Sequence, residues 1–183
     1  RLHYEDYKAG SAKLDTCMEL VHGALDGGHR ILLFSQFTGM LDIIGKRLAK
    51  EDIAFLKLTG ASSKESRAKM VAQFQAGEVP VFLISLKAGG VGLNLTAADV
   101  VIHYDPWWNV AAQDQATDRA HRIGQQHTVT VYKLIAKDTI EERIMRMQES
   151  KRDLVNSVLG GDGISSALFT REDVLALLGG DGR

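Results

Sequence analysis

The sequence has only one cysteine, Cys17, and therefore no second thiol with which it could pair. This excludes an internal disulfide and any zinc site built from several cysteines. We expect Cys17 to be a small buried apolar residue, as most free cysteines are. The sequence also has no apolar run of the roughly 18 residues that a membrane span requires, and no signal peptide. We therefore expect a soluble, intracellular protein with no membrane partner.

Neither sign of charge is in excess, because 22 lysines and arginines face 23 aspartates and glutamates and give a formal net charge of -1. Composition alone therefore gives no argument for nucleic-acid binding, and any DNA contact must come from a local patch or from a face completed by other sequence. The 183 residues are enough for one domain with an appended helical segment. Because the chain starts at Arg1 rather than at a methionine, we expect it to be a piece of a longer protein.

Short apolar runs alternate with helical patterns along the chain. Runs that are apolar throughout are typical of strands covered on both faces, and the alternation predicts an α/β fold, a three-layer sandwich around a mainly parallel sheet. In such sheets functional residues lie at the carboxyl ends of the strands. The predicted strands are Ile31–Phe34, Phe55–Leu58, Val81–Ile84, Val100–Ile102 and Thr128–Ile135.

The helical patterns have readable starts and apolar faces. A capping-box pattern at Ser62–Glu65 predicts one helix start, Asn109 predicts another for a helix running to about His121, and Asp138 opens a long helical extension. The expected apolar faces are Phe37, Leu41, Ile44 and Leu48 in one helix, Val71 and Phe74 in the next, and Ile140, Ile144, Met147, Leu154 and Val158 in the long helix. A short terminal helix is expected over 171–178.

A glycine-rich segment, 85–95, follows the third strand directly. Glycines at this place let the backbone approach a ligand closely, and Ser85 and Lys87 would suit phosphate oxygens. A tight connection between strand and helix explains the glycines equally well. Both interpretations stay open for this segment by itself.

Both tryptophans of the protein, Trp107 and Trp108, stand together after the fourth strand. Large aromatic side chains usually belong to the core, and we expect this for Trp107. Two adjacent side chains diverge, however, so Trp108 is expected at a surface, where it would stack on or wedge against nucleic acid.

The most informative segment carries Gln115, Arg119 and Arg122, which are spaced at i, i+4 and i+7. This spacing places the amide and the two guanidiniums on one stripe of a helix whose packing face is made of alanines. Paired guanidiniums match the oxygens of a polyphosphate and stay charged. A solvated face in which Asp114 and Asp118 pair with the arginines is the alternative, but it explains neither the alanines nor the stripe.

The sequence contains no P-loop of the form GxxxxGK[ST]. Its nearest approach, Gly45-Lys46-Arg47, lacks the serine or threonine and lies inside a helical pattern. The chain thus has residues suited to a γ-phosphate but none to hold the nucleotide. Arginine fingers act across an interface and contribute roughly 10³–10⁵ in rate, so the combination predicts the second lobe of a two-lobed motor.

Four segments together make the chain resemble the Swi/Snf-family ATPases, which belong to the superfamily-two helicase-like motors. They are ILLFSQFTGMLDII (31–44), LTGASSKESRAKMVAQF (58–74), SLKAGGVGLNLTAADVVIHYDPWWN (85–109) and QATDRAHRIGQ (115–125). They resemble helicase motifs IV, V and VI, and the likeness covers about residues 12–158. The joint occurrence of DPWWN, DRAHRIGQ and VYKLIAKDTIEERI is more specific than any single motif. Val110 departs from the proline that the family often has there, which puts only the local turn in doubt.

The resemblance implies a RecA-like fold and ATP-driven translocation on double-stranded DNA, normally without strand separation. It implies that Arg119 and Arg122 face ATP with Gln115 beside them. Further residues would lie on the ATP side, namely Gly90, Gly92 and Asn94, and others towards the DNA backbone, namely Ser35, Gln36, Thr59, Gly60, Lys87 and Trp108. ATP and Mg²⁺ would be held mainly by the N-terminal RecA-like lobe of the same parent chain, and none by this chain alone.

The predicted organisation is a second helicase lobe over 1–137, a brace helix over 138–159, and a linker with a short terminal helix over 160–183. We expect a monomer that is inactive as an ATPase by itself. Alternatives are a non-catalytic DNA- or partner-binding module derived from such a lobe, a strand-separating helicase, and a dinucleotide enzyme. The last lacks its GxGxxG fingerprint. Without a Lys/Arg-rich nuclear signal, the sequence favours the bacterial cytoplasm, or the nucleus if the source is eukaryotic.

Overall fold

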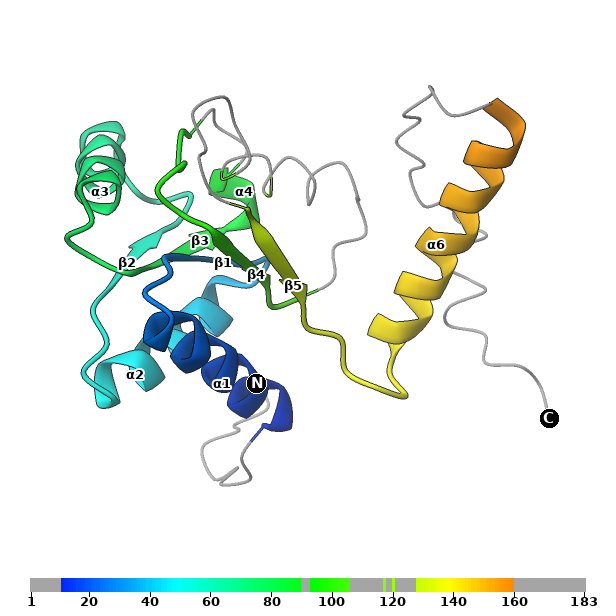
Figure 1. The fold of residues 1–183 in the computed structure, drawn as a ribbon, viewed down its shortest axis with the longest axis horizontal. Coiled ribbons are helices and arrows are strands. Elements are labelled where there is room, and N and C mark those ends of the chain that lie inside the picture. Colours follow the sequence, from blue (N-terminus) through cyan, green and yellow to red (C-terminus); the bar gives the residue numbers. More distant parts are fainter. Residues whose placement is uncertain (1–10, 90–92, 106–116, 118–119, 121–127, 160–183) are drawn as a thin grey trace.

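The centre of the molecule is a parallel β-sheet, seen in a computed structural model that describes residues 11–89, 93–105, 117, 120 and 128–159. The described part contains five strands in the order β2-β3-β1-β4-β5, and every neighbouring pair is parallel (Figure 1). The α/β fold with a parallel sheet is thereby confirmed. The strands are β1 (Ile31–Ser35), β2 (Phe55–Leu58), β3 (Val81–Ser85), β4 (Val100–His103) and β5 (Thr130–Lys133).

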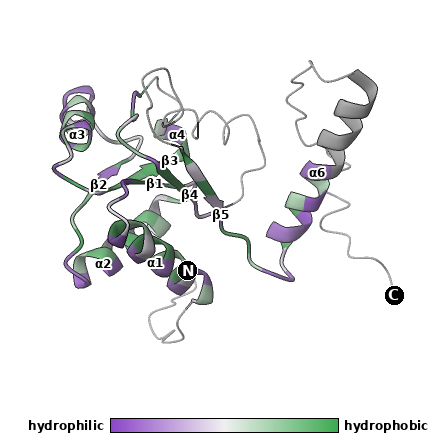
Figure 2. Ribbon diagram, in the orientation of Figure 1, coloured by the Kyte–Doolittle hydropathy of each residue, from purple (hydrophilic) through white to green (hydrophobic). Residues whose placement is uncertain are grey.

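The three central strands, β1, β3 and β4, are buried along their whole length. Their apolar runs without polar alternation follow from this, because helices cover both faces of the sheet. The outer strands are more exposed, and all four residues of β5 are exposed. Figure 2 shows hydrophobic colour concentrated on the central strands.

Two apolar clusters fill the spaces on either side of the sheet. One joins the sheet to α1 (Ala12–Asp26) and α2 (Thr38–Lys50) through residues such as Leu33 and Leu41. The other joins the opposite face, with Phe34 and Phe82, to α3 (Lys64–Ala76), α4 (Leu86–Gly89) and the segment that follows. Helix layers on both faces confirm the predicted three-layer sandwich.

Helix α1 was not among the predicted elements, although its signals are present in the sequence. Ser11 is its N-cap, and its side-chain oxygen accepts a hydrogen bond from the backbone N–H of Leu14 at 3.4 Å. The buried face includes Cys17 and Val21, which are both fully inaccessible. The expectation that Cys17 is a buried apolar residue is confirmed.

Helix α2 begins one residue later than its predicted apolar stripe. Leu41, Ile44 and Leu48 are fully buried, as predicted. Phe37, however, has an extended backbone as the N-cap and is 59% exposed, so its assignment to the buried face was wrong. An extended residue before the first helical turn does not share the helical direction of the side chains that follow.

Helix α3 is capped by Ser63, whose side-chain oxygen accepts from the N–H of Ser66 at 3.1 Å. The capping-box pattern had placed the cap at Ser62. The Ser62 hydroxyl oxygen instead accepts from the N–H of Thr59 at 3.2 Å and stabilises the turn after β2. The predicted apolar position Phe74 is fully buried.

The long helix α6 spans Ile140–Leu159 and extends away from the sheet (Figure 1). It starts two residues after the predicted Asp138, because Asp138 has φ of 58° and Thr139 accepts from the N–H of Glu141 at 3.2 Å. Ile144 is buried as expected, whereas Ile140 is 42% exposed, contrary to its predicted place on the apolar stripe.

Several predicted features fall outside the described residues. They are the side chains of Leu154 and Val158, the terminal helix over 171–178, and most of the predicted helix between Asn109 and His121, of which Thr117 and Ala120 are described. Among the helices of the described residues, none has the length and apolar character to cross a membrane.

Candidate functional site

The carboxyl ends of all five described strands lie at one edge of the sheet, because the strands are parallel. Ser35, Ser85 and His103 are the last residues of three adjacent buried strands. The loops that leave this edge contain most of the residues singled out from the sequence. We call it the carboxyl edge.

Asp105 joins two of these loops. Its Oδ2 accepts hydrogen bonds from the Ser35 hydroxyl and from the backbone N–H of Gln36, the latter at 3.3 Å. Burial raises the pKa of Asp105 above its ordinary value, against the opposing effects of the Ser35 hydrogen bond and of nearby Lys13. The contacts fix the start of the loop after β1 relative to the loop after β4.

The residues predicted to face DNA divide by exposure. Ser35 is fully buried and its hydroxyl is held by Asp105, so a direct contact of this side chain with DNA does not fit this conformation. Gln36 and Thr59 are half-buried, and Gly60 and Lys87 are exposed. The strand order β2-β3-β1 brings the segments that carry these four residues, two loops and α4, to adjacent positions along the carboxyl edge. Trp108 lies outside the described residues.

Of the three residues predicted on the ATP side, Asn94 is described and its side chain is exposed. The buried residues Leu93 and Leu95 flank it, which anchors the backbone on both sides. Gln75 of α3 holds the next turn, since its Oε1 accepts from the N–H of Ala97 at 2.8 Å. Gly90 and Gly92 lie outside the described residues.

The arginine stripe of Gln115, Arg119 and Arg122 also lies outside the described residues, but two positions within it are described. Thr117 Oγ1 is 3.0 Å from Nε2 of His103, at the end of β4. Ala120 is fully buried in the cluster that includes Phe34.

A further contact connects α6 to the body of the domain. Lys13 of α1 lies 2.6 Å from each carboxylate oxygen of Glu141, in the first turn of α6. The same ammonium group lies 5.1 Å from the centre of the Tyr104 ring, just after β4. Both side chains of the ion pair are largely buried, at 15% and 24% exposure. The start of α6 is therefore tied to α1 beside the carboxyl edge.

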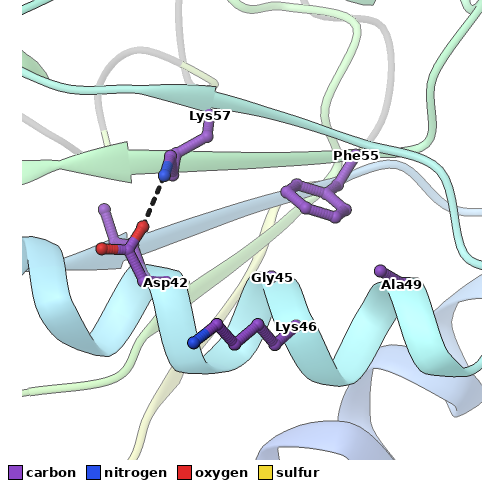
Figure 3. Close-up of a pocket in the computed structure, with 7 residues that line it drawn as sticks. Asp42, Gly45, Lys46, Ala49, Phe55 and Lys57 are labelled. Carbon is purple, nitrogen blue, oxygen red and sulfur yellow. Dashed lines mark hydrogen bonds and ion pairs between the residues drawn. The ribbon is translucent and has the colours of Figure 1, made fainter.

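A hollow of about 400 Å³ lies elsewhere, between α2 and β2 (Figure 3). Lys57 and Asp42 form an ion pair at this hollow, and the Phe55 ring packs against Gly45. A Cβ atom at Gly45 would lie 2.9 Å from the Phe55 ring, so glycine permits this close approach. None of the described residues predicted to be functional lines the hollow.

Sequence reasoning missed the residues that support the site: Lys13, Glu141, His103 and the Ser35 partner Asp105. In the sequence, Asp105 stands out only as the first residue of the DPWWN segment. Its isolated position after a buried strand is a usable signal, because a lone carboxylate there requires a partner from a neighbouring strand. The other three gave no local signal, since their partners are far away in the sequence.

Residues 12–124 match the family model of the helicase conserved C-terminal domain. The chain is 45% identical over 168 residues to an uncharacterized ATP-dependent helicase of Mycoplasma pneumoniae, covering 91% of this chain and 16% of that protein. It is 46% identical over 165 residues to the chromatin-remodeling ATPase INO80 of Cryptococcus neoformans, covering 90% of this chain and 9% of that protein. The chain thus spans a small part of the length of these relatives.

Among solved structures, the C-terminal part of the Fun30 ATPase domain is similar, with a TM-score of 0.72 and 38% sequence identity. The similarity covers 80% of this chain and 48% of that one. With the parallel sheet covered on both faces, this likeness confirms the predicted RecA-like α/β fold.

Proposed function

Because this chain belongs to the helicase conserved C-terminal domain family and is homologous to the C-terminal lobes of Swi/Snf-type ATPases, we propose that it is the second motor lobe of an ATP-driven double-stranded DNA translocase. The observation that carries the proposal is the stripe of Arg119 and Arg122 in a sequence without a P-loop. A domain that has arginines suited to a γ-phosphate but no P-loop to bind the nucleotide acts on a nucleotide held by another domain.

In this proposal ATP and Mg²⁺ are bound mainly by the N-terminal lobe of the parent protein. Among the described residues, no three His, Cys, Asp or Glu side chains gather in the manner of a metal site. This chain contributes Arg119 and Arg122 to the phosphates, with Gln115 beside them and with Gly90, Gly92 and Asn94 lining the same side. The exposed side chain of Asn94 between two buried leucines is consistent with such a role.

The DNA backbone lies, in the same proposal, against the loops after β1 and β2 and against α4, which follows β3 directly. Lys87 and Gly60 are exposed there, and Gln36 and Thr59 are partly accessible. Ser35 acts indirectly, because its bond to Asp105 sets the position of Gln36. Trp108 completes this surface. Contacts to phosphates rather than base edges make the grip independent of sequence and sensitive to salt.

Closure of the two lobes around ATP brings the arginines to the phosphates and changes the grip on DNA, so that cycles of closure and release move the motor. The Lys13–Glu141 ion pair holds the first turn of α6 on this lobe, which suits a brace helix that follows the lobe as it moves. The bacterial cytoplasm stays the proposed location, although the relatives include proteins of bacteria, fungi and animals.

The DNA side of the proposal predicts a specific effect of Lys87→Ala in the parent protein. Removal of one phosphate contact should weaken binding to double-stranded DNA to a similar extent for all sequences. The slope of log K against log salt should become shallower by about one, because one fewer counterion is released. Fluorescence-anisotropy titrations between low and physiological salt measure both quantities.

Lys50→Ala is the matched control, because it removes the same charge. Lys50 is exposed at the C-terminal end of α2, whereas the N-terminal end of α2 follows β1 at the carboxyl edge. It should leave the slope unaltered. Equal slopes for wild type, Lys87→Ala and Lys50→Ala would remove Lys87 from the DNA surface. A parent protein whose ATP hydrolysis is not stimulated by DNA would instead favour the non-catalytic binding module.

A further inference from the structure

We propose that His103 is a positioning residue for the arginine stripe, which it holds at the carboxyl edge through Thr117. The inference rests on the proposed function, because it assigns the contact that orients the residues meant to reach ATP. Neither the family match nor the named relatives point to this pair.

The geometry places an imidazole in a fully enclosed site at the end of β4. His103 is 1% exposed, and its Nε2 lies 3.0 Å from Thr117 Oγ1. Its ring stacks on the Phe34 ring of β1, with 5.4 Å between centroids and 19° between planes. Stacking fixes the plane of the ring and therefore the direction in which Nε2 points. The hydroxyl of Thr117 lies in that direction.

The hydrogen-bonding state of the ring follows from what surrounds it. Nδ1 is buried and has no hydrogen-bond partner among the described residues. A buried N–H without an acceptor costs more than a nitrogen lone pair without a donor, so the proton belongs on Nε2. The Nε2–H then donates to the Thr117 hydroxyl oxygen. This hydroxyl is the one acceptor in the described structure for the buried donor of His103.

A second anchor lies three residues further along. Ala120 is fully buried against the face of the sheet that carries Phe34, and its N–H donates to the carbonyl oxygen of Thr117 at 3.1 Å. Thr117 and Ala120 are therefore held to each other and each to the sheet. Arg119 stands between them in the sequence and Arg122 two residues beyond. Thr117 and Ala120 are thus two fixed points on either side of Arg119 in the sequence, one polar and one apolar.

The polar anchor has a directional effect that the apolar one lacks. Apolar burial tolerates small rotations, whereas a hydrogen bond to a stacked ring specifies both distance and angle. Catalytic contributions from charged groups are sensitive to position, since a misplacement of about 1 Å can cost roughly 10²-fold in rate. We expect the loss of this hydrogen bond to lower turnover, and to affect ground-state binding much less.

The test compares Thr117→Val, which removes the hydroxyl at nearly constant shape, with Thr117→Ser, which keeps it. In the parent protein, Thr117→Val should lower kcat for DNA-stimulated ATP hydrolysis about tenfold and leave the DNA affinity within about twofold. Thr117→Ser should restore kcat to within about threefold of wild type. Equal kcat for Thr117→Val and wild type, or equal losses for the two variants, would overturn the inference.

A second measurement does not depend on catalysis. Amide hydrogen exchange of this chain reports the bond from the Ala120 N–H to Thr117, and Thr117→Val should accelerate exchange at Ala120 about tenfold while β1 amides keep their wild-type rates. Equal acceleration in β1 would mean a general loss of stability and would refute a positioning role. If Ala120 responds as expected and kcat does not, the inference fails and the proposed function stands. A wild-type parent without DNA-stimulated hydrolysis would contradict the proposed function and leave the exchange result intact.

Discussion

Replacement of Arg122 by alanine in the parent protein is expected to abolish DNA-stimulated ATP hydrolysis, with a loss of roughly 10³-fold or more, while DNA binding stays nearly intact. The guanidinium is proposed to neutralise the charge that builds up on the γ-phosphoryl group during transfer, and that interaction is stronger in the transition state than in the ground state. Because Arg122 is assigned to the ATP side and not to the DNA surface, the two activities should separate.

Steady-state hydrolysis with saturating DNA, together with anisotropy titrations of the same preparations, makes this comparison. Arg47→Ala is the matched control, because Arg47 is exposed on α2, pairs with Glu51 and lies away from the carboxyl edge. It should hydrolyse ATP at the wild-type rate. The present chain alone should hydrolyse ATP no faster than buffer. Retained activity in Arg122→Ala would remove this arginine from the mechanism.

The strands were predictable from the sequence because each of them is defined by local composition. The central strands carry apolar residues at every position except the last, and a run such as Val81–Ile84 is too short for a helix and too apolar for a loop. Parallel order followed from the alternation of strands and helices. One helix, α1, was missed altogether, and the fifth strand is shorter than the predicted 128–135. The other errors lie at helix ends, where one backbone angle decides the outcome, as at Phe37 and at Asp138 with its positive φ.

The supporting contacts of the site were not predictable in the same way. Ser35 and Asp105 are separated by 70 positions, and Lys13 and Glu141 by 128. Such pairs exist only after the strand order is fixed, and the sequence specifies neither partner locally. Ser35, predicted to lie towards the DNA backbone, is buried in the structure and donates its hydroxyl hydrogen to Asp105. The exposure of Lys87 requires no long-range information, because lysine is rarely buried.

The pH dependence of stability should show a second large effect, centred on His103. Burial, with a smaller contribution from Lys133, lowers the pKa of His103 to about 4 from its ordinary value of 6.5. Above pH 6.5 the imidazole is neutral in both folded and unfolded states, and its contribution is fully present. Between pH 6.5 and 4 the unfolded state takes up a proton that the folded state does not. The free energy of unfolding should therefore fall by about 1.4 kcal/mol per pH unit, or about 3 kcal/mol across the window.

The comparison with His103→Gln isolates this contribution, because the amide can still donate to Thr117 but does not titrate. Urea unfolding at pH 7, 6 and 5 should show wild type losing stability relative to the variant by about 2 kcal/mol at pH 5. The carboxylates with lowered pKa values, among them Glu51 and Asp99, do not disturb this comparison. Their contribution to the free energy of unfolding is lost only below about pH 4.5. Asp105, with a raised pKa, acts in the opposite direction and is common to both proteins. Parallel curves for the two proteins between pH 7 and 5 would mean that the folded state takes up a proton at His103 over the same pH range as the unfolded state. A charged imidazole would then have to be accommodated against Phe34, and the neutral Nε2–H donor assigned to it would be wrong.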